Sequence, residues 1–252
     1  MCTAVRTDTM LSDAEKNRYS RQIRLFGEDG QEILRGTSVF IAGAGGLGSA
    51  ISFYMAAAGF GKIRICDCDS VELSNLNRQI LHANADVGRA KAKSAYETLT
   101  GINPEIEVEA LVETISEENI DQLLQGCDLI MDAMDNFPVR YLLNRSALER
   151  KIPLFHGAIS GYQGQATTII PGKTACLACV FPRAPPASVF PALGSTCGVI
   201  GSIQVTEAVK YVTGTGQLLE NRLLLWDGLC GCLDEMAYER NAACLMCSDG
   251  GH

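Results

Sequence analysis

The feature that most constrains this chain is a glycine-rich segment, Gly43-Ala44-Gly45-Gly46-Leu47-Gly48, which lies directly after an apolar run at 38–42. Gly43, Gly45 and Gly48 match the spacing G-x-G-x-x-G. Glycines at these positions permit a tight turn and let the backbone approach a phosphate group closely. A helix that begins at such a turn offers unpaired N–H groups and a partial positive charge to the anion. The segment therefore predicts a strand, a phosphate-binding turn and a helix in succession.

An acidic residue follows the next apolar run at the spacing of a ribose-binding carboxylate. Asp67 comes directly after the run at 62–66, nineteen residues beyond Gly48, and can accept hydrogen bonds from ribose hydroxyls. Asp69 could share or replace this role. The alternative is that the glycines only allow a helix to pack closely on a strand, but the context favours nucleotide binding.

Apolar runs and helical patterns alternate along the first two thirds of the chain. Predicted strands occupy 38–42, 62–66, 106–112, 129–133 and 153–156, and predicted helices occupy 47–58, 89–99, 116–125 and 139–150. This alternation, with strands that are apolar on both sides, predicts an α/β fold with a Rossmann-like, mostly parallel sheet and helices on both faces. The remaining predicted segments are a polar helical arm at 12–34, C-terminal strands at 166–170 and 223–226, a loop at 182–195 and a helix at 199–212.

Length and charge limit the class of protein. A chain of 252 residues that is 47 % hydrophobic fits one large domain over 1–252, divided into a helical arm (12–36), a nucleotide-binding core (37–160) and a C-terminal part (161–252). The formal charge of −8 and the pI near 5.0 argue against nucleic acid or anionic membrane as a partner. The uncharged stretch at 39–61 could span a bilayer by length, but its glycine cluster predicts a buried strand, turn and helix instead.

Eleven cysteines, an odd number, do not suggest a disulfide framework in a chain of this length. The first residues, 1–17, mix charges of both signs and contain no apolar leader segment. We therefore expect reduced thiols and a cytoplasmic location.

Two cysteine pairs share the spacing of zinc ligands. Cys176 and Cys179 form one C-x-x-C pair, and Cys244 and Cys247 form the second. Two such pairs can close one tetrahedral Zn²⁺ site, which would clamp the C-terminal tail onto the region after the strand at 166–170. A closed shell of four thiolates leaves no position for a substrate, so the predicted role is structural. The alternatives are a redox C-x-x-C motif and buried free cysteines.

Polar and basic residues follow the ribose-binding strand. Asn75, Arg78 and Lys91 lie on the connection that leaves it, at the carboxyl edge of the predicted sheet. Two separated cations suit a triphosphate, whose charge must be neutralised before an anion can attack it. A dinucleotide pyrophosphate needs fewer cations, so this segment favours a triphosphate. The alternative is a solvent-exposed basic helix face, which fits Arg89 and Lys93 better.

A carboxylate follows the next strand. Asp135 lies just beyond 129–133 and is expected to face the same crevice, where one carboxylate beside phosphates could hold Mg²⁺. Asp135 or Asn136 could instead cap the helix that begins near Pro138. Both roles are compatible if one residue caps and the other binds.

Taken together, these segments resemble the ThiF/MoeB/HesA adenylyltransferases, bacterial relatives of ubiquitin-activating enzymes. The resemblance covers nearly the whole chain. It rests on Arg18-Tyr19-Ser20-Arg21-Gln22-Ile23, the glycine turn, Asp67 and Asp69, Ser74-Asn75-Leu76-Asn77-Arg78-Gln79, Asp132 with Asp135-Asn136, the two C-x-x-C pairs and Gly198-Val199-Ile200-Gly201-Ser202.

The resemblance implies MgATP-dependent adenylation of the C-terminal glycine of a small ubiquitin-like sulfur carrier that ends in Gly-Gly, with release of pyrophosphate. By motif position it implies that Gly46 lies at the phosphates and that Asp135 holds Mg²⁺. It places Asp67 at the ribose and Asn75, Arg78 and Lys91 at the phosphates. It also implies a homodimer in which Arg21 reaches the partner's active site. The carrier is left open among those of thiamin, molybdopterin and cysteine pathways and a short peptide.

The side chains agree with this chemistry. A carboxylate is already a nucleophile at neutral pH, so cations must bring two anions together and no general base is required. His156, at the end of a predicted strand, is expected to be structural or to contact substrate. The loop at 184–194 lacks the cysteine that many family members use for covalent relay. Cys197 follows at a predicted helix start, where the helix dipole could favour a thiolate, but small buried cysteines at such positions are usually only packed. The competing functions are an NAD(P)- or flavin-dependent oxidoreductase and a non-catalytic zinc and nucleotide scaffold for a carrier protein.

Overall fold

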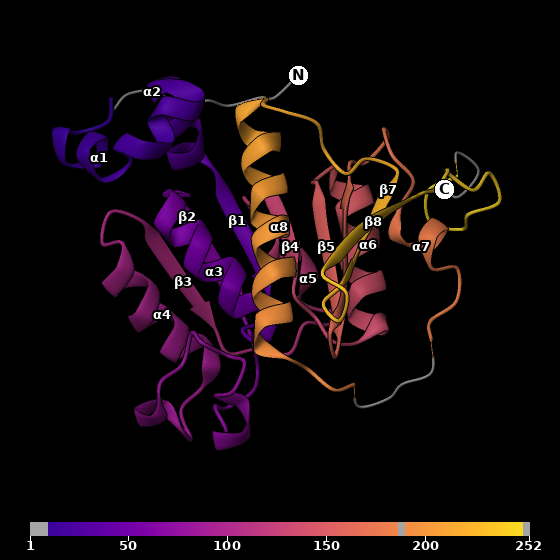
Figure 1. Ribbon diagram of the computed structural model, residues 1–252, viewed down its shortest axis with the longest axis horizontal. Coiled ribbons are helices and arrows are strands. Elements are labelled where there is room, and N and C mark those ends of the chain that lie inside the picture. Colours follow the sequence, from indigo (N-terminus) through magenta and orange to yellow (C-terminus); the bar gives the residue numbers. More distant parts are fainter. Residues whose placement is uncertain (1–9, 186–189, 249–252) are drawn as a thin grey trace.

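The computed structural model describes residues 10–185 and 190–248, which contain one eight-stranded sheet (Figure 1). The strand order is β3-β2-β1-β4-β5-β6-β7-β8. The parallel strands are β1 (Ser38–Ala42), β2 (Lys62–Cys66), β3 (Glu107–Leu111), β4 (Leu129–Asp132) and β5 (Leu154–Ser160). The antiparallel extension consists of β6 (Gln163–Ile169), β7 (Arg222–Asp227) and β8 (Cys232–Ala237).

Helices cover both faces of this sheet, as the sequence predicted. They are α1 (Asp13–Arg18), α2 (Ser20–Gly36), α3 (Gly46–Ala58), α4 (Lys91–Ile102), α5 (Ile120–Leu123), α6 (Phe137–Arg150), α7 (Leu177–Val180) and α8 (Gly194–Thr213), with short 3-10 turns η1 (Leu73–Asn75) and η2 (Asn84–Asp86). Apolar residues of α3, α4 and α8 share one core cluster, and those of α5 and α6 share another.

Alternating side chains of β1 build these two clusters. Val39 and Ile41 belong to the cluster under α3 and α8, whereas Phe40 and Ala42 belong to the cluster under α5 and α6. Successive side chains of a strand point to opposite faces, so a strand between two helical layers must be apolar throughout. The α/β prediction is confirmed for this reason.

Glycines let α3 pack closely against its neighbours. A Cβ atom on Gly48 would lie 2.0 Å from the carbonyl oxygen of Gly43, which itself has a φ of 101°. On the adjacent helix, a Cβ on Gly201 would lie 2.8 Å from the Cβ of Ala50. Only glycine fits at these contacts, so the turn, α3 and α8 are held together at backbone distance.

The structure departs from the predicted elements in several places. β8 was not predicted; it is an exposed edge strand with no β-branched residue and no buried face that would mark it in the sequence. The helix predicted at 116–125 is only the short α5, which Gly126 (φ 74°) follows. β5 extends to Ser160 because it pairs with β6, and α8 begins at Gly194 rather than at 199.

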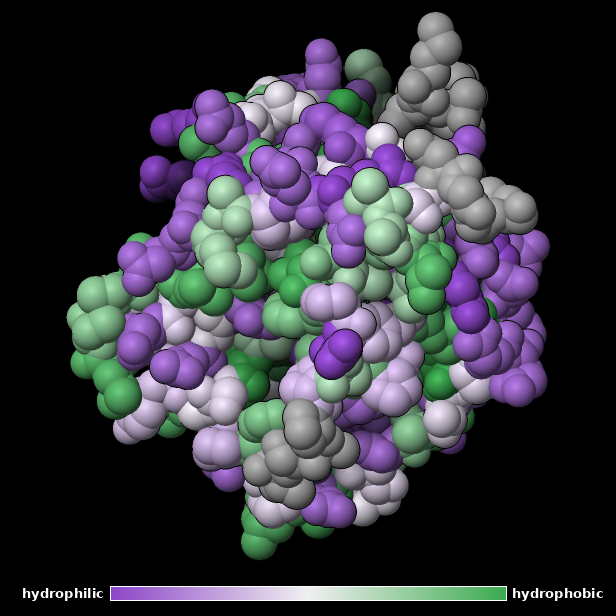
Figure 2. Space-filling model, turned by 90° about the vertical axis from the view of Figure 1, so that its right-hand side faces the viewer, coloured by the Kyte–Doolittle hydropathy of each residue, from purple (hydrophilic) through white to green (hydrophobic). Residues whose placement is uncertain are grey.

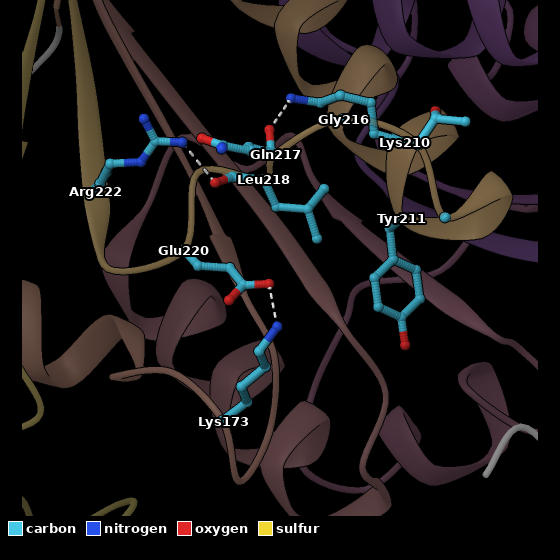
Figure 3. Close-up of a pocket in the computed structure, with 10 residues that line it drawn as sticks. Lys173, Lys210, Tyr211, Gly216, Gln217, Leu218, Glu220 and Arg222 are labelled. Atoms are coloured by element: carbon cyan, nitrogen blue, oxygen red, sulfur yellow. Dashed lines mark hydrogen bonds and ion pairs between the residues drawn. The ribbon is translucent and has the colours of Figure 1, made fainter.

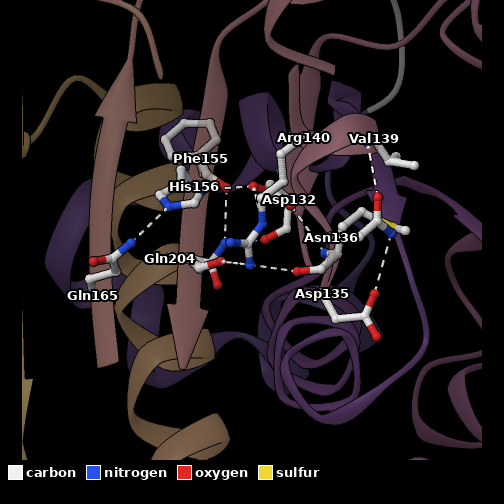
Figure 4. A network of polar contacts seen from close by, with 11 residues as sticks. Asp132, Asp135, Asn136, Val139, Arg140, Phe155, His156, Gln165 and Gln204 are labelled. Carbon is white, nitrogen blue, oxygen red and sulfur yellow. Dashed lines mark hydrogen bonds and ion pairs between the residues drawn. The ribbon is translucent and has the colours of Figure 1, made fainter. Parts of the chain in front are cut away.

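A buried polar network lies where β4 and β5 end (Figure 4). His156 Nδ1 lies 2.7 Å from Asp132 Oδ2, and both side chains are inaccessible to solvent. Arg140 lies with its Nε 3.6 Å from the same carboxylate oxygen, and Gln204 donates to the carbonyl oxygens of Asp132 and Phe155, each at 2.9 Å. The network joins α6 and α8 to the two strands between them.

The same network holds the backbone that leads into the carboxyl edge. Arg140 donates from Nη2 to the carbonyl oxygens of Met134 (2.6 Å) and Gly157 (3.2 Å), and Asp132 Oδ1 accepts from Met134 N at 3.0 Å. The peptide just before Asp135 is thereby fixed from two sides. Of the two roles expected for His156, the structure shows the structural one.

Burial keeps His156 neutral. A carboxylate can only accept hydrogen bonds, so the bond to Asp132 assigns the proton to Nδ1 and leaves Nε2 as an acceptor toward Gln165, 3.5 Å away. Burial lowers the pKa of His156 despite the neighbouring carboxylate, and burial also lowers the pKa of His82.

We expect these histidines to destabilise the fold in mild acid. Below about pH 6.5 the unfolded chain binds protons that the folded histidines do not, so the free energy of unfolding should fall by up to about 1.4 kcal/mol per pH unit for each. His156→Asn keeps a hydrogen-bond donor for Asp132 but cannot titrate. It should remove the contribution of His156 to the pH dependence of the free energy of unfolding, measured by urea titrations between about pH 5 and 7. His82→Asn should do the same, and an unchanged slope in the His156 variant would contradict the assignment.

Candidate functional site

The glycine turn and Asp67 meet at the carboxyl edge of the parallel strands, which lies at the lower end of the sheet in Figure 1. Ala44 N donates to Asp67 Oδ2 at 2.8 Å, and Asp67 Oδ1 accepts from Asp69 N at 2.8 Å. His82, which the sequence did not assign, is buried and its Nε2 lies 3.0 Å from the Ala44 carbonyl oxygen. Asp67 thus holds the turn in place and retains lone pairs for further donors, since a carboxylate has about four acceptor positions.

The first turn of α3 points its N–H groups at this edge. Its N-cap is Gly45, and no side chain caps it. A Cβ on Gly46 would lie 2.6 Å from the Cys197 sulfur and 3.7 Å from Arg78 Cγ. The start of α3, the start of α8 and the segment that carries Arg78 therefore converge on one place.

The polar segment after β2 presents one cation without a carboxylate partner. Arg78 is half-buried and donates from Nη1 to the carbonyl oxygen of Ser74 (3.1 Å) and to Asn77 Oδ1 (3.3 Å). No ion pair links its guanidinium to a carboxylate within 10–185 and 190–248. Asn75 is buried, and its Oδ1 accepts from Glu72 N at 3.1 Å, so Asn75 shapes this segment locally.

Lys91 begins α4 and lies 6 % exposed beside Asp69. Its Nζ is 2.9 Å from Asp69 Oδ2, and this hydrogen bond lowers the pKa of Asp69. A lysine at a helix N-terminus is repelled by the positive end of the helix dipole, so a neighbouring anion is needed to stabilise its charge. Asp69 supplies one, and an ammonium group has further donors for another anion.

Of the two residues that follow β4, Asn136 and not Asp135 caps the next helix. Asn136 is the N-cap of α6, with Oδ1 accepting from Val139 N at 3.0 Å. Asp135 is exposed, and Figure 4 shows its carboxylate outside the buried network. Among the described residues, no cation pairs with it; its Oδ1 accepts only from Asn136 Nδ2, at 3.3 Å. The carboxylate can therefore accept an external cation.

Arg21 lies away from this edge. It is exposed on α2. In the last turn of this helix, the Leu34 carbonyl oxygen accepts a hydrogen bond from Gly61 N at 3.2 Å. Tyr19, just before α2, accepts from Asn103 Nδ2 at 2.8 Å. Gly61 and Asn103 precede β2 and β3, so the arm packs at the amino edge of the sheet (Figure 1). The structure does not bring Arg21 to the glycine turn of its own chain.

The two C-x-x-C pairs come together, and their four sulfur atoms lie within 4.8 Å of one another. The separations are 3.9 Å between Cys176 and Cys179, 3.7 Å between Cys176 and Cys244, and 3.4 Å between Cys179 and Cys247. Four thiolates at about 2.3 Å from a tetrahedral Zn²⁺ are about 3.8 Å apart, so the cluster fits this ion. Asn241 N also donates toward the Cys179 sulfur at 3.4 Å, a contact that sequence spacing does not reveal.

Cys197 does not have the environment that its predicted helix start suggested. It lies in the first turn of α8 but is only 2 % exposed, and burial raises the pKa of its thiol although Arg78 acts in the opposite direction. Of the two interpretations of Cys197, the structure therefore supports packing rather than a reactive thiolate. Its sulfur fills the space beside Gly46 instead.

A hollow of about 420 Å³ lies at the other end of α8, beyond Gly214 (Figure 3). Three cations line it, but Lys173 pairs with Glu220 at 2.6 Å and Arg222 with Glu235 at 2.7 Å. Lys210 donates to the Gln217 carbonyl oxygen at 2.6 Å. These cations are already satisfied, so the hollow offers less to an anion than the edge that carries Arg78.

No helix among the described residues is long and apolar enough to cross a membrane.

Comparisons with known proteins agree with the fold and the motifs. The ThiF family model matches residues 19–246. The chain is 40 % identical over 249 residues to the "SAMP-activating enzyme E1" of Haloferax volcanii, covering 96 % of this chain and 92 % of that protein. It is 39 % identical over 248 residues to the "Sulfur carrier protein adenylyltransferase" of Thermus thermophilus, covering 93 % and 92 %.

A solved structure shares the architecture at lower identity. The crystal structure of E. coli MccB with ATP superposes with a TM-score of 0.81 at 22 % identity, over 94 % of this chain and 75 % of that one. The family match spans the glycine turn, the polar segment after β2 and three of the four clustered cysteines, Cys176, Cys179 and Cys244. The chain belongs to the ThiF family.

Proposed function

We propose that this protein is an ATP-dependent adenylyltransferase that activates the C-terminal glycine carboxylate of a small ubiquitin-like sulfur carrier. The observation that carries the proposal is the convergence of the α3 N-terminus, Arg78, Lys91 and the unpaired carboxylate of Asp135 at one sheet edge. The names of the two relatives, a SAMP-activating enzyme and a sulfur carrier protein adenylyltransferase, support it.

The substrate is MgATP, and we assign the residues by charge. The glycine turn, with Gly43, Gly45, Gly46 and Gly48, would receive phosphate oxygens on its N–H groups. Asp67 would accept from the ribose, and Asp135 would hold the Mg²⁺ that arrives with the nucleotide. The cationic side chains of Arg78 and Lys91, with Asn75 beside them, would neutralise the phosphates.

The reaction needs positioning more than proton transfer. A carboxylate oxygen of the carrier's terminal glycine attacks the α-phosphorus of ATP, and the bond to the β-phosphate oxygen breaks as pyrophosphate leaves. Negative charge builds up on the phosphoryl oxygens and the leaving group, where fixed cations and helix N–H groups act most strongly. No described histidine needs to act as a base, which fits the buried, neutral His156.

A hydride-transfer function is less well supported. A dinucleotide-dependent oxidoreductase would use the same glycine turn but has no use for two cations and a free carboxylate around it. Exchange of labelled pyrophosphate into ATP, measured against carriers of the thiamin, molybdopterin and cysteine pathways that end in Gly-Gly, decides the matter. Absence of exchange with every carrier would favour the scaffold alternative.

Replacing the phosphate-facing cations should slow this exchange strongly. We expect Arg78→Ala and Lys91→Ala each to lower kcat/KM by about 10²–10³-fold, as for the loss of one transition-state contact. Lys93→Ala is the matched control, because Lys93 carries the same charge on the same helix and is exposed. Unchanged turnover in the Arg78 and Lys91 variants, with folding intact by circular dichroism, would reject their roles.

The four clustered cysteines would hold a structural Zn²⁺ that ties the tail at 244–247 to the start of α7. We expect Cys176→Ser to reduce bound zinc per chain, measured by atomic emission, and to lower the unfolding temperature. Cys68→Ser, an exposed cysteine outside the cluster, should change neither. Equal zinc content in the wild type and Cys176→Ser would contradict the assignment.

We also propose a homodimer in the cytoplasm in which Arg21 serves the partner's site, because α2 lies at the edge opposite to its own glycine turn. Arg21→Ala and Asp135→Ala proteins should each be inactive. Mixed subunits should recover about a quarter to a half of wild-type exchange, since one of the two sites in a heterodimer is intact. Inactive heterodimers, verified by two affinity tags, would count against action across the interface.

A further inference from the structure

The turn between β7 and β8 carries two exposed thiols that the proposed chemistry does not use. Cys230 and Cys232 flank Gly231, which has a φ of 69°, and Asp227 pairs with Cys232 across the hairpin. Of the described cysteines, only these two and Cys68 are exposed, because the others are buried or belong to the four-sulfur cluster. Figure 2 shows the side of the molecule that is on the right in Figure 1, where hydrophilic and hydrophobic residues are mixed.

The turn keeps the two thiols within bonding range. Residues two apart span at most about 7 Å even in extended chain, and a turn through a left-handed glycine shortens this distance. Disulfides require Cα atoms about 4.4–6.8 Å apart. The neighbouring Cys230 side chain raises the pKa of the Cys232 thiol. The other sulfur contacts of the pair are weak, to backbone oxygens at 3.7 Å.

We propose that Cys230 and Cys232 form a dithiol site that low-molecular-weight disulfides oxidise reversibly to an intramolecular disulfide. One protein thiolate attacks glutathione disulfide and releases one glutathione thiolate, which leaves a mixed disulfide on the protein. The second thiol then loses its proton and attacks the protein sulfur of that mixed disulfide, which releases the second glutathione. Two electrons and two protons leave the protein, and one glutathione disulfide becomes two glutathione thiols.

The site adjoins the edge where the nucleotide is proposed to bind, although it does not depend on that function. Gly228 N donates to the Tyr162 carbonyl oxygen at 2.9 Å, and Gly161 N donates to that of Pro191 at 2.7 Å. The hairpin is therefore joined, through the β5–β6 turn, to the segment that leads into α8.

The chain contains its own matched control. Cys66 and Cys68 have the same C-x-C spacing, but Cys66 is buried at the end of β2 and donates to the Glu113 carbonyl oxygen. Burial raises the pKa of Cys66 to about 12, so its thiol is inert at neutral pH. The C-x-C spacing alone would predict that both pairs are reactive. In the structure only the hairpin pair has both thiols exposed.

Trypsin separates the two pairs into the peptides 223–240 and 65–78, each with two cysteines. After titration with oxidised glutathione and acid quenching, mass spectrometry should show peptide 223–240 at the mass of its dithiol form minus two hydrogens. Excess reduced glutathione should return the peptide to the dithiol mass. Peptide 65–78 should carry at most a mixed disulfide at Cys68. In Cys230→Ser and Cys232→Ser the mixed disulfide should persist, at least about tenfold more abundant than in the wild type.

Both substitutions are at exposed positions, so the unfolding temperatures of the variants should match that of the wild type. Differences in oxidation then report thiol reactivity and not loss of folding. Wild-type protein that stops at mixed disulfides on 223–240, that shows no oxidation there, or that oxidises 65–78 equally well would overturn the proposal. None of these measurements requires ATP or a carrier, so their outcome is separate from that of pyrophosphate exchange.

Discussion

The close approach of the α3 N-terminus to the end of β1 is the constraint on which the rest of the structure depends. Gly48 leaves room for only a hydrogen atom beside the Gly43 carbonyl oxygen, and Asp67 fixes the turn from the neighbouring strand through Ala44. Since α8 in turn packs on α3 through Gly201, the position of one glycine turn sets the position of two helix N-termini. Both point at the place where Arg78 lies.

The interior beneath that edge is polar, which is unusual for a sheet between two helical layers. The buried polar side chains at the ends of β4 and β5 are those of Asp132, His156 and Arg140. Buried polar and charged side chains cost little only when nearly all of them have hydrogen-bond or ion-pair partners, as these do. The arrangement fixes the backbone on which Asp135 sits while leaving that carboxylate in solvent. A site that positions two anions requires such a rigid backbone beneath the exposed Asp135 carboxylate.

The antiparallel extension uses cysteines in two different ways. Four sulfurs from segments 68 residues apart converge near α7, where they can share one metal ion. The pair on the β7–β8 hairpin lies at an exposed edge, apart from that cluster. Environment separates these roles, because a thiol's chemistry follows its burial and its neighbours more than its spacing.

The sequence by itself determined the parallel core and the candidate residues. Strands buried on both faces must be apolar throughout, and G-x-G-x-x-G after such a strand allows few conformations, so 38–48 and Asp67 were predictable. Only the tertiary structure decided what depends on contacts between distant segments: the edge strand β8, the ion pair of Lys91 with Asp69, the Arg140 network and the buried state of Cys197. Exposed strands leave no hydrophobic period, and the pKa of a thiol is set by neighbours that arrive from elsewhere in the chain.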